Sequence, residues 1–157
     1  MKFICSLITV NEINRSRDFY ERILDQKVKI DYGENVTYHG DFAIHLKSHF
    51  QGLIDNVEIK TRSNNFELYF EHDDIVQLVD RLNSYGVTYV HTLREQPWRQ
   101  MVVRFYDPDE NIIEVGETME HLSYRLHTEG MSIDKIVSIT YMSETFVSES
   151  IKKYNNG

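Results

Sequence analysis

The chain has 157 residues, of which 41% are hydrophobic and 27% charged, and its formal net charge is −8 at pH 7. This length fits one domain, or one domain with a short appendage, and the composition is that of an ordinary soluble globular protein. The acidic excess argues against nucleic acid or an anionic membrane surface as the main partner. No apolar run approaches the roughly 20 residues that a membrane-spanning helix needs.

The N-terminal stretch MKFICSLITV predicts a first strand over residues 2–10. A signal peptide is not expected, because no small-residue cleavage site follows the short apolar run. The single cysteine, Cys5, excludes an intrachain disulfide and is typical of a reducing compartment, so we expect a cytoplasmic protein.

The first half of the chain continues with a helix and three short strands. Residues 14–24 place Phe19, Tyr20, Ile23 and Leu24 on one side of the predicted helix. Strands are predicted at 27–31, 35–39 and 42–47. Residues 48–64 have mixed polarity and weak periodicity, and we interpret them as a linker.

The same order of elements then restarts. Residues 66–71 alternate in polarity, and a helix over 74–85 is predicted to begin at Asp73 or Asp74 and to end at Gly86. Strands follow at about 87–94, 100–106 and 111–117.

The repetition predicts an α+β fold. Two βαβββ modules, 1–47 and 66–117, would form a cupped, antiparallel-rich sheet with one face under a helix and one face open. The register of the repeat matches Cys5 with Glu67 and His45 with Glu114.

Residues 118–157 form a predicted helical extension, separate from the domain at 1–117. Gly130 would end a helix that includes His121, and Ser132 and Ser143 would begin two more. From residue 119 onward four basic residues stand against five acidic ones, so a DNA-reading role is disfavoured. Dimerisation or the capping of a pocket is the expected role of this extension.

Glu114 is the residue from which a functional hypothesis starts. It follows the proline turn Asp107-Pro108-Asp109, and in a strand it points away from the face that carries Ile113 and Val115. A carboxylate among strand aliphatics needs a partner if it is buried, and a metal ion is one candidate. The alternative is a solvated carboxylate on an exposed sheet face, and the same two alternatives apply to Glu67.

Several segments resemble the vicinal oxygen chelate superfamily, which includes glyoxalase I, extradiol dioxygenases and bleomycin-binding proteins. They are the helix FYERIL, the junction ELYFEHDD and the hairpin RFYDPDENIIEVGE, and the resemblance covers about residues 1–117. It implies a divalent metal held by one residue from the first and last strand of each module. Carried over, these positions are Cys5, His45, Glu67 and Glu114. The chain departs from the pattern at Cys5, where histidine or glutamate is usual, and at Glu110, where glycine is common.

The resemblance implies a metal-dependent lyase or isomerase that acts on a small α-oxo substrate. His45, Glu67 and Glu114 make a nitrogen–oxygen set that suits nickel, zinc, manganese, cobalt or iron, with Glu114 or Glu67 moving a proton. Alternatively, His45 is structural and Cys5 is a small buried thiol. The remaining histidines are interpreted as surface or loop residues: His39, His49, His72, His91, His121 and His127.

The rival hypothesis is a metal-free protein that binds or sequesters a small molecule such as a drug. Trp98, Tyr69, Arg104 and Tyr106 would then line a pocket for a planar or anionic ligand. If they do not, the tyrosines pack between sheets and Trp98 covers a loop. In either case we expect a small-molecule ligand, a homodimer and no nucleic-acid or membrane partner. A ligand-sensing regulator that uses the helical extension is the third and least favoured hypothesis.

Overall fold

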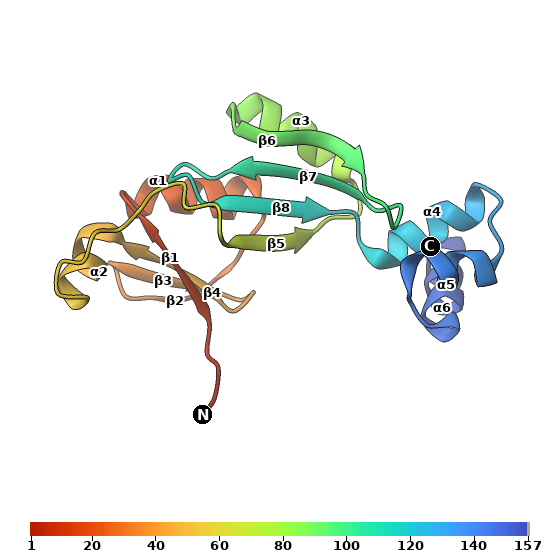
Figure 1. Ribbon diagram of the computed structural model, residues 1–157, viewed down its shortest axis with the longest axis horizontal. Coiled ribbons are helices and arrows are strands. Elements are labelled where there is room, and N and C mark those ends of the chain that lie inside the picture. Colours follow the sequence, from red (N-terminus) through yellow and green to blue (C-terminus); the bar gives the residue numbers. More distant parts are fainter. Residues whose placement is uncertain (157) are drawn as a thin grey trace. The chain divides into compact units, whose positions relative to one another are not determined.

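The computed structural model describes residues 1–156 and contains two four-stranded sheets (Figure 1). The first part of the chain forms β1 (Ser6–Val10), α1 (Ile13–Arg17), the π-helix η1 (Asp18–Ile23), β2 (Val28–Asp31), β3 (Asn35–Tyr38), β4 (Phe42–Leu46) and α2 (Lys47–Leu53). The second part forms β5 (Glu67–Glu71), α3 (Ile75–Tyr85), β6 (Thr88–Glu95), β7 (Met101–Tyr106) and β8 (Ile112–Gly116). The predicted α+β fold with two modules is confirmed.

Each sheet has the same order of strands: β1-β4-β3-β2 in the first and β5-β8-β7-β6 in the second. In the first sheet β1 pairs with β4 in parallel, whereas β2–β3 and β3–β4 are antiparallel. The parallel pair follows from the helical crossover between β1 and β2, which returns the chain in its original direction. The first sheet is therefore mixed rather than purely antiparallel.

The strand register assigns residues to the two faces of the first sheet. Ile8, Ile44 and Val36 are cross-strand neighbours and are all buried, so they lie on the core face. The open face carries the row Leu7, Ala43, Thr37 and Ile30, followed by the row Thr9, His45 and Asn35. His45 therefore lies on the open face, as its alternation in β4 requires.

Residues 48–64, interpreted from the sequence as a linker, contain most of helix α2. This helix has no buried residue of its own, which explains its weak periodicity. It follows β4 without an intervening loop, so that its first turns lie beside the end of that strand.

Contacts within the chain define two compact units. Unit 1 comprises 1–68, 81–90 and 105–113, and unit 2 comprises 69–80, 91–104 and 114–157. In unit 1 the core is aromatic: Tyr38 stacks on Phe42 with centroids 4.8 Å apart, and Phe19 meets Phe105 edge-on. These rings are all buried.

The predicted proline turn is held by a network of hydrogen bonds within unit 1. Asp107 accepts hydrogen bonds from the Tyr20 hydroxyl and from the backbone N–H groups of Asp109 and Asn111. Burial raises the pKa of Asp107, although the hydrogen bonds from Asn111 and Tyr20 act in the opposite direction. Asp109 in turn accepts from Arg15 and from the Ser16 hydroxyl, which ties the turn to α1.

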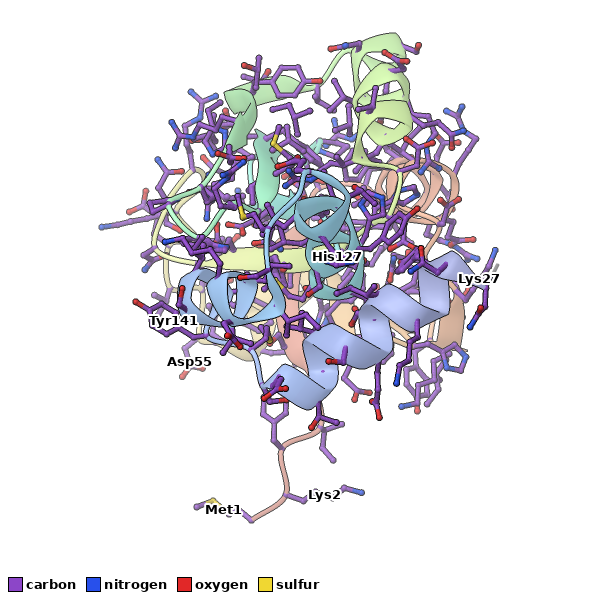
Figure 2. All side chains as sticks on the ribbon, turned by 90° about the vertical axis from the view of Figure 1, so that its right-hand side faces the viewer. Met1, Lys2, Lys27, Asp55, His127 and Tyr141 are labelled. Atoms are coloured by element: carbon purple, nitrogen blue, oxygen red, sulfur yellow. The ribbon has the colours of Figure 1, made fainter. Side chains whose placement is uncertain are left out.

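Three helices form the C-terminal part of unit 2: α4 (Met119–Thr128), α5 (Ile133–Thr140) and α6 (Glu144–Asn155). Each begins at a hydroxyl N-cap, at Thr118, Ser132 and Ser143 respectively. Their shared core is Leu122, Leu126, Ile136, Val147 and Ile151. Figure 2 looks onto this extension, with His127 of α4 and Tyr141 after α5 labelled. Within residues 1–156 no helix is long and apolar enough to cross a membrane.

Candidate functional site

Glu114 lies in the middle of β8 and is only 5% exposed. Its carboxylate forms an ion pair with the guanidinium of Arg104 on β7, the strand next to β8 in the sheet. Arg104 was predicted to bind substrate and Glu114 to bind metal, so the structure brings two predicted site residues together as partners. A buried carboxylate that is matched in this way is no longer an uncompensated charge.

His91 of β6 contacts the same guanidinium. Its Nε2 lies 3.2 Å from Arg104 Nη1, and its Nδ1 lies 2.9 Å from the Thr92 carbonyl oxygen. Because a guanidinium only donates and a carbonyl only accepts, His91 carries its proton on Nδ1 and its lone pair on Nε2. His91, which was interpreted from the sequence as a surface or loop residue, thus belongs to the cluster of Arg104 and Glu114.

His45 is 6% exposed and belongs to a second group, in unit 1. Its Nε2 lies 2.9 Å from Nδ1 of His49 in α2, and its Nδ1 lies 3.3 Å from the Asn35 amide nitrogen. Glu34 stands 3.3 Å from His49 Nδ1. Burial and the neighbouring His49 lower the pKa of His45, while Glu34 raises it to a smaller extent. Two imidazoles and one carboxylate thus meet at the junction of β4 and α2.

The other two predicted metal ligands lie in different surroundings. Glu67 begins β5, is exposed, and lines a cavity of about 360 Å³ with Phe66, Ile112 and two asparagines. Cys5 precedes β1 and is a half-buried free thiol.

Tyr69 and Trp98 are connected through a residue that the sequence did not single out. Gln100 is 3% exposed; its amide nitrogen donates to the Tyr69 hydroxyl oxygen and to the Glu117 carbonyl, and its amide oxygen accepts from Trp98 Nε1. Burial and the hydrogen bond to Glu71 raise the pKa of Tyr69 to about 12. Gly116 makes room for this arrangement, because a Cβ there would lie 2.5 Å from the Gln100 amide nitrogen.

Tyr106, the last of the predicted ligand-binding residues, is used inside unit 1. Its hydroxyl donates to Asn64 at 2.9 Å, and the Arg62 guanidinium lies 4.6 Å from its ring centre. These contacts hold the chain segment before β5 against the end of β7.

The donor set does not fit the divalent metal that the resemblance implies. A metal ion at Glu114 would lie beside the Arg104 guanidinium, and the two positive charges would repel each other in a poorly solvated site. Across residues 1–156, no three His, Cys, Asp or Glu side chains form a group that could hold a metal ion.

Spacing in the sequence could have identified one of the groups found here. His121 and Arg125 are four residues apart on α4, a spacing that brings side chains together on a helix. His45 and His49 have the same spacing but lie on β4 and α2, so their contact depends on the junction between that strand and that helix. Glu117 is 1% exposed and receives hydrogen bonds from both His121 and Arg125. No comparable spacing in the sequence indicated the contacts of Gln100 or Asp107.

Comparisons with known proteins agree with the fold described above. Residues 3–120 match a family model described as a glyoxalase-like domain. A solved protein of unknown function from Agrobacterium tumefaciens strain C58 is 37% identical, with a TM-score of 0.68, and the match covers 75% of this chain and 94% of that one. A search of curated proteins finds no match.

More distant structures share the fold. A hypothetical protein from S. aureus is 17% identical with a TM-score of 0.66, covering 75% of this chain and 95% of that one. A lactoylglutathione lyase from A. tumefaciens is 16% identical with a TM-score of 0.57, covering 74% and 92%. At such identities the likeness concerns the fold, and activity must be argued from the site.

Proposed function

Since this chain belongs to the glyoxalase-like family, we propose that it binds a small planar or anionic organic molecule without a divalent metal ion. The observation that carries this proposal is the Arg104–Glu114 ion pair. The pair occupies the carboxylate that the resemblance assigns to a metal, and it replaces the metal's positive charge with a fixed guanidinium.

Two half-exposed aromatic rings support the choice of a planar ligand. Tyr69 is 49% and Trp98 37% exposed, and Gln100 fixes both by hydrogen bonds to their polar atoms. Fixed aromatic rings offer stacking surface at a small cost in conformational entropy. Arg104 and the phenol of Tyr69, which keeps its proton at neutral pH, supply the polar contacts.

The metal content of untagged protein tests this proposal first. The parent, incubated with nickel, zinc or manganese and then desalted, is expected to retain far less than one metal ion per chain by mass spectrometry. Trp98 is the only tryptophan, so its fluorescence then reports ligand binding directly. A ligand that quenches the parent should bind at least about tenfold more weakly to Tyr69→Ala.

A metal-dependent lyase or isomerase acting on a small α-oxo compound is the second candidate. Proteins of this family generally depend on a metal, and His45, one of the ligands that the resemblance implies, lies beside His49, which contacts Glu34. The described residues do not hold these three side chains in a metal-binding arrangement, so this candidate requires them to rearrange around the ion. Near-stoichiometric metal in the parent that is lost in His45→Ala, but kept in the exposed-histidine control His39→Ala, would overturn the metal-free proposal in favour of this one. In either case we propose a cytoplasmic location, on the basis of the lone cysteine.

A further inference from the structure

The C-terminal helices build a second cavity inside unit 2. It has a volume of about 460 Å³, within the range of small-molecule sites. Its apolar walls come from the first turn of α3, from β6 and from β7, through Ile75, Val76, Leu93 and Met101. Half of its polar lining residues come from α4 and α6, most of which follows residue 120, where the family-model match ends; the other half are the carboxylates Asp73, Asp74 and Glu117.

The Arg125 guanidinium is the strongest hydrogen-bond donor in this wall, and it already donates to other groups of the protein. Arg125 donates from Nε to Glu117, from Nη1 to Glu129, and from Nη2 to both Glu117 and the Arg99 carbonyl. Four of the five guanidinium N–H groups are therefore committed to the protein. The Tyr154 hydroxyl is likewise committed, since it donates to Asp73 at 2.6 Å.

His121 presents an acceptor to the cavity. Its Nδ1 lies 2.8 Å from the Glu117 carboxylate, which is 1% exposed and can only accept. Of the two neutral tautomers, this contact selects the one with the proton on Nδ1 and the lone pair on Nε2. This is the arrangement in which a buried carboxylate fixes the tautomer of a histidine and leaves Nε2 free to act on a ligand.

The remaining polar groups of the cavity are carboxylates. Asp73 accepts from Thr118 and Tyr154, and these hydrogen bonds overcome the effect of burial and lower its pKa, so it is ionised at neutral pH. Asp74 uses Oδ1 to cap α3 through the Gln77 N–H. A carboxylate oxygen can accept more than one hydrogen bond, so both retain accepting capacity.

From this inventory we infer that the cavity binds a small apolar molecule that carries a protonated amine. An ammonium group supplies donors to a wall whose side chains mainly offer acceptors, and its charge complements the two aspartates. Its apolar body would lie against Ile75, Leu93 and Met101. This site is separate from the surface of the proposed function and does not depend on it.

Three aryl compounds of similar shape test the charge requirement: phenethylamine, phenethyl alcohol and phenylacetate. Each is titrated into the full-length protein, and NMR follows the methyl groups of Ile75, Val76 and Met101. We expect the amine to shift these signals at concentrations of about 10 mM or below, and at least about tenfold more tightly than the alcohol. Absence of shifts with the amine, or equal binding of phenylacetate, would overturn the inference.

Two variants locate the binding. His121→Phe keeps an aromatic ring but removes the acceptor, and Val76→Trp fills the mouth of the cavity from a position that is 62% exposed. Both are expected to weaken amine binding at least about tenfold. His127→Phe, at an exposed position of the same helix that does not line the cavity, should leave it unchanged. Unchanged binding in Val76→Trp would place the amine elsewhere and refute the site.

Discussion

At Glu110 the chain differs from the residue type expected for its family, and the difference lowers the stability of the folded state. The family resemblance leads one to expect glycine at this position, and the backbone explains why: Glu110 has a φ of 66°, in the left-handed region. A side chain with a Cβ is strained there by about 1 kcal/mol relative to glycine. The compensation visible in the structure is an ion pair with Arg62 at 3.2 Å between two half-exposed side chains, which contributes little.

We therefore predict that Glu110→Gly stabilises the protein by about 1 kcal/mol in urea-induced unfolding. Glu110→Ala is the matched control, because it removes the ion pair but retains the Cβ. The alanine variant should lie within about 0.5 kcal/mol of the parent. Equal effects of glycine and alanine would mean that the ion pair, and not the backbone, decides stability at this turn.

Among the elements, α6 packs on α4 and α5 through a shared apolar core, and one carboxylate also links it to the loop before α3. Asp73, in the loop before α3, accepts hydrogen bonds from Tyr154 near the end of α6 and from Thr118, the N-cap of α4. Burial acts to raise the pKa of Asp73, but these hydrogen bonds outweigh it, and the pKa falls below its ordinary value of 3.8. The ionised carboxylate is therefore the form that the folded state prefers.

The lowered pKa of Asp73 determines how the stability of the protein changes with pH. A carboxyl group whose pKa is lower in the folded state contributes stability above its unfolded pKa and loses it as the pH falls. Stability measured by thermal unfolding should decrease below about pH 4 in the parent, and this decrease should be smaller in Asp73→Asn. Glu149→Gln, an exposed carboxylate change within α6, serves as the control and should titrate like the parent.

At the scale of the whole molecule, several exposed apolar residues lie on the first sheet and in the segment before it. Leu7 and Ile30 belong to one cross-strand row of the open face and are 39% and 42% exposed. Phe3, Ile4 and Tyr32 are more exposed still. Monomeric proteins seldom leave such a group uncovered, and we propose that a second copy of the chain covers it.

Light scattering coupled to gel filtration should accordingly give the mass of a dimer at micromolar concentration. Ile30→Asp should shift the protein to monomer, because it introduces a charge into the apolar row. Val90→Asp makes the same change at a 45% exposed position on β6, outside this group, and should leave the dimer intact. A monomeric parent would contradict the proposal outright.

Local pattern in the sequence was enough to predict most elements of this fold. Alternation identified β5, the hydroxyl and carboxyl N-caps identified the starts of α3, α5 and α6, and the Asp107-Pro108-Asp109 turn identified the last hairpin. These features depend on residues that are close together in the chain, so their physical cause lies in the sequence itself. Helix α2 was missed because none of its residues is buried, which leaves no apolar period to detect.

The partners of the functional side chains could not be predicted in the same way. The sequence left open whether Glu114 is solvated or is buried with a partner; in the structure it is buried, and its partner Arg104 is supplied by the neighbouring strand of the sheet. Gln100, just before β7, likewise contacts Glu117, just after the neighbouring β8, and Tyr69 on β5, the next strand beyond β8 in the sheet. The sequence by itself thus determined where charges and rings occur along each element, whereas strand pairing and helix packing decided which of them meet, because those contacts join residues that are remote along the chain.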